Sequence, residues 1–194
     1  MHTLISTASG GELMLATIPY QRDNAVAYAR RWALSRNPLF ENYSGIGGDC
    51  TNFVSQSIYA GGCTMNYTPD FGWYYISPTN RAPAWTGVEF FYNFMTTNDE
   101  IGPYATEVGD GDLLPGDVIQ LGDETGDFYH TLIVVGEEDG DYLVAAHSND
   151  SLDRPLSSYT NSQARFLRIE GIRIEIPDRY GRNCFRDFIS GRRI

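Results

Sequence analysis

The stretch GGDCTNFVSQ, residues 47–56, places a cysteine after two glycines and an acid and directly before a helical pattern. The thiolate is the nucleophilic form of cysteine, and the positive end of a helix dipole favours that form. The free N–H groups of a first helical turn can stabilise an oxyanion, and glycines let a substrate backbone come close. Cys50 is therefore a candidate nucleophile. The alternative is a buried structural cysteine, since cysteine is among the residue types most often buried.

A cysteine nucleophile needs a base, and the chain has only three histidines, His2, His130 and His147. His130 opens the run HTLIVV, so its ring is expected at the mouth of a sheet, within reach of a thiol on a packed helix. The alternative is a structural histidine at a strand edge. A third polar group must orient a catalytic imidazole. On an extended strand, the side chains of His147 and Asn149 would point to the same face, so both are candidates, whereas Asp150 would point to the opposite face.

Four further residues are considered for smaller roles. Gly48 and Asp49 precede the cysteine and could border the oxyanion or the substrate, although a helix cap is the favoured interpretation of Asp49. Gln56 is interpreted as a packing or hydrogen-bond partner inside the helix. Trp73, in an aromatic segment, could form the wall of a substrate site or belong to the core.

The cysteines and acids do not indicate a metal site. Cys63 and Cys184 have no CxxC partner, so neither a zinc ribbon nor a disulfide framework is expected, and both are interpreted as structural. The acidic run DETGD, residues 123–127, lacks the ligand spacing of a calcium loop and is interpreted as a solvated turn. We therefore expect no metal and no cofactor.

Helical patterns occupy the first half of the chain. An amphipathic helix is predicted in RDNAVAYARRWALSRNP, with Asp23 as its cap and Pro38 beyond its end. A second helix is predicted to begin at Cys50 and to stop at Gly61 and Gly62. A weaker helical pattern covers AWTGVEFFYNFMTT, residues 84–97.

The second half is rich in β-branched and aliphatic runs, which predict four or more antiparallel strands. Two of these runs, TLIVV and YLVAAH, are joined by GEEDGD and predict a hairpin. The predicted strands lie in LLPGDVIQL, YHTLIVVGEEDG, DYLVAAHSND and ARFLRIEGIRIEIP. Helices followed by strands favour an α+β fold. We expect one domain over residues 20–194, after a flexible lead-in over residues 1–19.

Composition excludes several classes of partner. The formal charge of −11 and pI near 4.6 argue against nucleic-acid binding, which depends on Lys and Arg contacts to phosphates. No apolar run approaches the roughly 20 residues that span a bilayer, so no membrane insertion is expected. A monomer is expected. The amino terminus lacks the basic and apolar regions of a secretory signal.

The blocks GGDCTNFVSQSIYAGG, WYY, AWTGVEFFYNF, PGDVIQL, HTLIVV and AAHSND together resemble the putative amidase domain family of the papain-like cysteine hydrolases. Wider relatives of that family are the NlpC-type and CHAP cell-wall peptidases. The resemblance covers roughly residues 20 to 172. It is specific because the cysteine block is combined with a later PGD and a histidine at the start of a strand.

The resemblance implies a papain-like fold with helices packed on an antiparallel sheet. It implies Cys50 as nucleophile, His130 as general base and acid, and His147 or Asn149 as the orienting residue. The implied substrate is peptidoglycan or a peptide, cleaved at an amide bond, and the implied location is secreted or cell-wall associated, with a cytoplasmic location as the alternative. Two other functions fit the same residues, a papain-like deamidase or transglutaminase acting on protein glutamine, and a non-catalytic wall-binding module.

Overall fold

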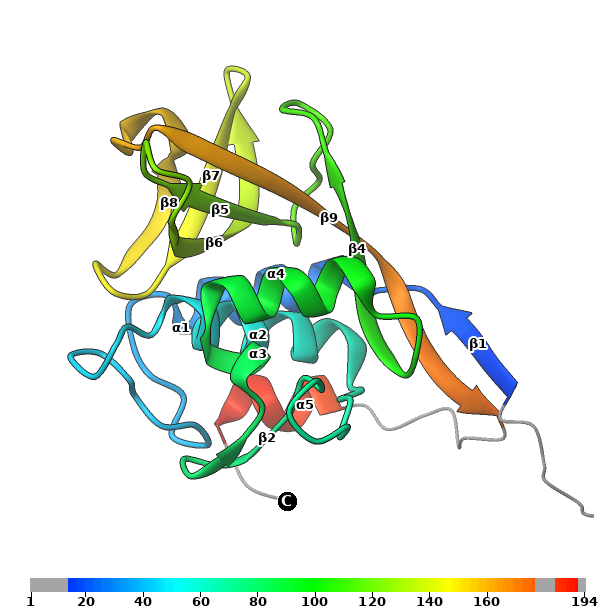
Figure 1. The fold of residues 1–194 in the computed structure, drawn as a ribbon. Coiled ribbons are helices and arrows are strands. Elements are labelled where there is room, and N and C mark those ends of the chain that lie inside the picture. The colour runs from blue at the N-terminus through cyan, green and yellow to red at the C-terminus, as the bar shows by residue number, and fades with distance from the viewer. Residues whose placement is uncertain (1–13, 177–183, 192–194) are drawn as a thin grey trace, which may run out of the picture.

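Helices and strands form two layers in the computed structural model, which describes residues 14–176 and 184–191 (Figure 1). Figure 1 shows strands β5 to β8 on one side of helices α1, α2 and α4, and α5 on the other side of these helices. The helices are α1 (Arg22–Trp32), α2 (Cys50–Gly62), α3 (Pro83–Thr86), α4 (Val88–Thr97) and α5 (Cys184–Ser190). This arrangement confirms the α+β class.

The main sheet has seven strands in the described part of the chain, and every neighbouring pair is antiparallel. Its order is β1-β9-β5-β6-β7-β8, and β4 also pairs with β9. The strands are β1 (Met14–Ile18), β4 (Gly102–Val108), β5 (Val118–Gly122), β6 (Phe128–Glu138), β7 (Asp141–Ala146), β8 (Ser151–Pro155) and β9 (Gln163–Ile176). A separate small hairpin consists of β2 (Tyr75–Ser77) and β3 (Asn80–Arg81), and a short 3-10 helix spans Leu156–Ser158.

The longest of these strands, β9, pairs along its length with β5, then β4, then β1. Figure 1 shows it crossing from the region of β5 to β8 out to β1. The prediction of a flexible lead-in was wrong for residues 14–18, because they form β1 and are hydrogen-bonded to the end of β9. Residues 1–13 lie outside the described residues, so that part of the prediction stays a prediction.

The two helices predicted first have the expected positions. α1 begins at Arg22, so Asp23 lies in its first turn and not at its cap. α2 begins at Cys50 and ends at Gly62, as predicted, and Cys63 follows it in a left-handed conformation with φ 51°. A Cβ on Gly61 would overlap the ring of Tyr20, and one on Gly62 would overlap a side chain of β9. These glycines therefore also permit close packing of the last turn of α2.

The remaining elements follow the sequence patterns in part. The weaker helical pattern forms α3 and α4, which are separated by Gly87 in an extended conformation. The hairpin of β6 and β7 is confirmed, with Ile133 opposite Ala145. β4 and β8 were not predicted, because each contains residues typical of turns: β4 begins with Gly-Pro, and β8 contains Asp153 at φ 51° and ends in proline.

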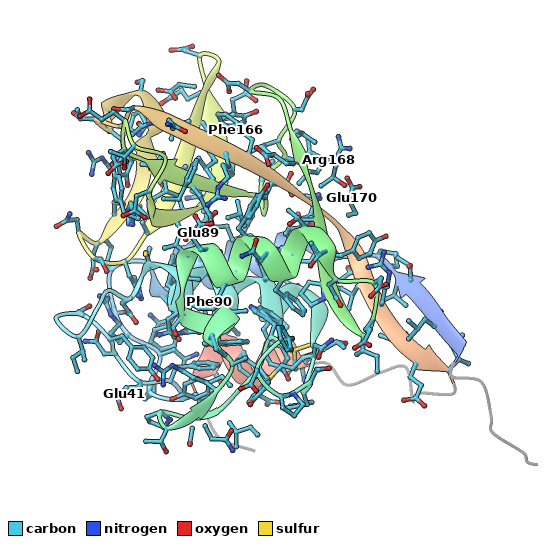
Figure 2. The ribbon with its side chains drawn as sticks, in the orientation of Figure 1. Glu41, Glu89, Phe90, Phe166, Arg168 and Glu170 are labelled. Atoms are coloured by element: carbon cyan, nitrogen blue, oxygen red, sulfur yellow. A yellow bond between two sulfur atoms is a disulfide. The ribbon has the colours of Figure 1, made fainter. Side chains whose placement is uncertain are left out.

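Both faces of the central strands are buried. One cluster fills the space between the helices and the sheet and contains Phe53, Trp85 and Ile133. A second cluster, containing Leu121, Leu132 and Val134, covers the opposite face. The ion pair between Glu89 of α4 and Arg165 of β9 joins the layers, and Figure 2 shows Glu89 on the side of α4 that faces the strands.

A disulfide joins Cys63, just beyond α2, to Cys184, the first residue of α5. The cysteine spacing predicted no disulfide framework, and it could not predict this single disulfide, because the fold brings together residues that are 121 positions apart in sequence. Their structural role is confirmed. A link across so long a loop restricts the unfolded chain and stabilises the packing of α5 on α2. Within the described residues Cys50 is the free cysteine.

None of the helices in residues 14–176 and 184–191 is both long and apolar enough to cross a membrane.

Candidate active site

A cavity of about 340 Å³ opens where the start of α2 meets the edge of the sheet. Cys50 and His130 both contribute to its wall, together with Gly48 and Asn149. The complete lining is Gly47, Gly48, Cys50, Leu121, Tyr129, His130, Ser148, Asn149, Arg154, Tyr159 and Thr160. A larger hollow of about 410 Å³ lies against α4, but its lining has neither a cysteine nor a histidine. The smaller cavity is therefore the candidate site.

Cys50 is the first residue of α2 and is 6% exposed. Its neighbour Thr51 fixes the start of the helix against β6, because the Thr51 and Thr131 hydroxyls are hydrogen-bonded at 2.9 Å. The amide of Gln120 on β5 donates a further bond of 3.3 Å to Thr131. This buried polar chain sets the position of the thiol relative to the sheet.

His130 lies near the start of β6, opposite Leu121 of β5. Side chains alternate along a strand, so His130 and Thr131 are on opposite faces, and His130 lies at the rim where the cavity meets the second core cluster. Its ring centroid is 6.0 Å from that of Tyr159. Burial and, to a lesser extent, the positive charge of Arg154 lower the pKa of His130 from 6.5 to about 4. At neutral pH its ring is therefore uncharged and able to accept a proton.

Asp49 is fully buried and its carboxylate connects four segments. Oδ1 accepts bonds from the Tyr43 N–H at 3.1 Å and from the Asn52 amide at 2.7 Å. Oδ2 lies 2.9 Å from Nε of Arg36 and 2.8 Å from Nδ1 of His147. Asp49 occupies the predicted N-cap position of α2, but its side chain makes no cap hydrogen bond.

His147 faces away from the cavity, and the prediction that it could orient His130 was wrong. Its Nε2 donates to the Trp32 carbonyl oxygen at 2.9 Å, while Nδ1 lies against Asp49. Its ring also stacks on Phe53 with 4.0 Å between centroids. With both nitrogens engaged and 1% of the residue exposed, His147 is a structural residue.

The strand parity argument fails because β7 ends at Ala146. Ser148 and Asn149 then adopt positive φ values of 64° and 110°, which turn the chain sharply. The Ser148 hydroxyl accepts the Asp49 N–H at 2.7 Å, and Asp150 receives two bonds of 2.8 Å from Arg36. Asn149 is left lining the same cavity as His130.

The two glycines before Cys50 are required by backbone conformation more than by space. Gly47 and Gly48 have φ values of 111° and 102°, in the region that favours glycine. A Cβ on Gly47 would meet no atom within 4 Å, and one on Gly48 would lie 3.6 Å from the Ser148 hydroxyl. Both glycines line the cavity, so close approach of a substrate remains compatible with the structure.

Trp73 does not reach the cavity, so its prediction as a substrate wall was wrong. It is fully buried, its Nε1 donates to the Ser55 hydroxyl at 3.0 Å, and it packs on Trp85 with 4.7 Å between ring centroids. These aromatic side chains belong to the core between the layers. Gln56, by contrast, accepts a 2.7 Å bond from the Tyr28 hydroxyl, which confirms its interpretation as a hydrogen-bond partner.

Sequence reasoning did not identify Arg154 and Tyr159 as lining residues. They belong to β8 and the segment after it, where Asp, Pro and Ser residues gave no strand pattern. It also gave no role to Asp117 of the PGD block. Asp117 is buried, accepts N–H bonds of 2.8 Å from Leu114 and Ile169, and pairs with Arg22 at 2.6 Å. It thereby fixes the start of β5 against β9 and α1.

Within the described residues no group of three or more His, Cys, Asp or Glu side chains is placed to hold a metal ion. In the DETGD segment, Oδ1 of Asp123 accepts the N–H groups of Thr125 at 2.8 Å and Asp127 at 3.1 Å. This internal bonding confirms the interpretation of the segment as a turn.

Comparisons with known proteins agree with the resemblance to the amidase domain family. The family described as "Putative amidase domain" matches residues 19–169. The chain is 37% identical over 150 residues to "Uncharacterized protein YhbB" from Bacillus subtilis (strain 168), an alignment that covers 75% of this chain and 46% of that protein. The chain thus spans about half the length of this curated relative. No solved structure matches the chain.

The network around Asp49 predicts that neutralising Asp49 and neutralising Asp150 have unequal effects on the free energy of unfolding. Asp49→Asn removes a buried charge that faces Arg36 and His147, so we expect it to lower the free energy of unfolding by about 3–5 kcal/mol. Asp150→Asn removes the more exposed partner of the same arginine and should cost less than about 1 kcal/mol. Urea denaturation monitored by tryptophan fluorescence measures both. Equal losses would contradict the structural role assigned to Asp49.

Proposed function

The chain belongs to the putative amidase domain family, and on that premise we propose that it is a cysteine hydrolase that cleaves amide bonds through an acyl-enzyme on Cys50. The observation that carries the proposal is that the free cysteine at the start of α2 and the uncharged His130 line one cavity. Amide hydrolysis is the activity for which the family is named.

In the proposed mechanism His130 accepts the proton of the Cys50 thiol, and the sulfur attacks the carbonyl carbon of the amide. Backbone N–H groups at the start of α2 stabilise the oxyanion. Since the Asp49 N–H already donates to Ser148, these donors come from Cys50 onward. The C–N bond then breaks, and the amine leaves with the proton held by His130. Water hydrolyses the thioester, with His130 again as the base, and restores the thiol.

A papain-like architecture is part of this proposal. The support is a helix whose first residue is the cysteine, packed against an antiparallel sheet whose strand β6 brings the histidine. Asn149 is proposed as the residue that orients His130, because it lines the cavity while His147 is occupied by Asp49 and Trp32.

Peptidoglycan is the proposed substrate, cleaved at a stem-peptide bond or at the amide that joins the peptide to the sugar. The resemblance to cell-wall peptidases suggests this class of substrate. The Cys63–Cys184 disulfide supports a location outside the reducing cytoplasm, because such bonds persist in oxidising compartments. Access to a cell wall requires the same location.

The first test is digestion of isolated cell walls by the purified protein, followed by mass spectrometry of the released fragments. Cys50→Ala removes the nucleophile and should reduce fragment release by roughly a thousandfold or more, at an unchanged urea midpoint. Release that survives this substitution would rule out Cys50 as the nucleophile.

The same experiment separates the rival functions. A glutamine deamidase or transglutaminase would leave walls intact and label a protein substrate with an amine. A non-catalytic wall-binding module would bind walls equally well with and without the Cys50 thiol and release nothing.

The proposal that Asn149 orients His130 is tested by a pair of substitutions in the segment HSND, residues 147–150. Asn149→Ala should lower kcat by about 10- to 100-fold without changing stability, since Asn149 lines the cavity and is exposed. His147→Asn should instead lower the urea midpoint, because it removes one of the buried partners of Asp49 and the ring that stacks on Phe53. The opposite assignment of the two effects would show that Asn149 is not the orienting residue.

The lowered pKa of His130 predicts an unusual pH profile. Only the uncharged ring acts as a base, so the acidic limb of kcat/KM should have its midpoint near pH 4, below the ordinary histidine value of 6.5. The folded pKa lies below the unfolded one, so this group's contribution to stability is complete above about pH 6.5 and declines as the pH falls toward 4. Circular dichroism at each pH separates unfolding from titration. A midpoint at or above 6.5 would contradict the environment described for His130.

A further inference from the structure

The cavity contains one side chain with a permanent charge among the residues that line it, and that charge is positive. The lining includes Arg154 and no aspartate or glutamate. The whole chain has 25 acidic and 14 basic residues and a formal charge of −11. The lining of the cavity therefore lacks the acidic residues that outnumber the basic ones in the chain as a whole. An anion should bind more favourably in the cavity than on the rest of the surface.

Arg154 is held by neutral groups. Its Nε donates to the Ser158 hydroxyl at 2.8 Å and its Nη2 to the Ser158 carbonyl oxygen at 3.1 Å. Its guanidinium lies over the ring of Tyr159 with 3.7 Å to the centroid. A guanidinium has five N–H donors, so these two bonds fix its plane and leave donors for a ligand.

No carboxylate in residues 14–176 and 184–191 lies within ion-pair distance of Arg154. Other arginines of the chain do have such partners, namely Arg22, Arg30, Arg36, Arg165 and Arg168. A planar arginine with fixed orientation and no acidic partner has the geometry that recognises a carboxylate with two parallel hydrogen bonds.

We propose that Arg154 is a specificity-determining residue that binds a carboxylate of the substrate close to the scissile amide. The preferred substrates are then peptides with a free carboxylate on a residue next to the cleaved bond. This inference rests on the proposed function, because it concerns the substrate of the same cavity. Such a carboxylate would also offset the positive charge that Arg154 presents to His130, so binding of the substrate would strengthen the base.

The test uses the free thiol as a probe and needs no turnover. Iodoacetate and iodoacetamide alkylate a thiol by the same displacement, in which sulfur bonds to the methylene carbon and iodide leaves, and they differ in charge. We expect the ratio of their rates at Cys50 to be about tenfold higher in the wild type than in Arg154→Gln. Taking the ratio cancels any change in the reactivity of the thiol itself.

Arg31→Gln is the matched control, since it removes the same charge from an exposed arginine that stacks on Trp32 outside the cavity. It should leave the ratio within about twofold of the wild type. A ratio in Arg154→Gln equal to that of the wild type would overturn the proposal. Mass spectrometry of the labelled peptides confirms that Cys50 is the site of alkylation.

The sign of the salt effect gives a second measurement on the unmodified protein. Arg154 attracts the anionic reagent, so raising NaCl from about 20 mM to about 500 mM should slow iodoacetate and leave iodoacetamide nearly unchanged. The net charge of −11 alone would repel iodoacetate, and salt would then accelerate it. Acceleration would overturn the proposal even if Arg154→Gln failed to fold.

These outcomes are separate from those that test the proposed function. Wall digestion that does not depend on Cys50 would contradict the proposed function. Equal alkylation ratios in the wild type and Arg154→Gln, or acceleration of iodoacetate by salt, would contradict the role of Arg154, whether or not walls are digested.

Discussion

The buried carboxylate of Asp49 is the interaction on which the geometry of the cavity depends. A charge without water must be paired and hydrogen-bonded, and here the partners come from segments far apart in the sequence: Arg36 and Tyr43 before α2, Asn52 within it, and His147 after β7. Because each partner satisfies part of the same carboxylate, these segments are fixed relative to one another. Cys50 follows Asp49 directly, so the network also fixes the thiol.

The sheet places the other wall of the cavity through a different set of contacts. β5 and β6 have both faces buried, and the polar chain from Gln120 through Thr131 to Thr51 aligns β6 with the start of α2. Asp117 holds the beginning of β5 with bonds to β9 and α1. The histidine therefore lies at the rim of a rigid sheet, in an environment dry enough to keep its ring uncharged. The packing of α2 and of the sheet thus positions Cys50 and His130, the two groups proposed for catalysis, without a direct bond between them.

Sequence patterns were sufficient for the features that depend on local structure. The start of α2 at Cys50, the hairpin of β6 and β7, the α+β class and the shared cavity of Cys50 with His130 all follow from periodicity and turn residues. Features that depend on long-range packing were missed. The role of His147 could not be predicted from the alternation of side chains along a strand, because β7 ends one residue earlier, at Ala146. The ring instead lies against Asp49, which is 98 positions away in sequence. Likewise Trp73 joins the core and Cys63 finds Cys184 only in the folded chain.

Helix α2, which begins at the proposed nucleophile Cys50, is secured at both ends, by the Asp49 network before Cys50 and by the disulfide just after Gly62. A helix fixed in this way can neither slide nor rotate, and one residue of rotation would turn the sulfur by about 100°. The opposite wall is built differently, because Arg154 and Tyr159 are anchored mainly by bonds among exposed residues of β8 and the short 3-10 helix after it. The two walls of the cavity are thus held by different means. A buried ion pair and a disulfide hold the wall that carries Cys50, and hydrogen bonds close to the surface hold the wall that carries Arg154.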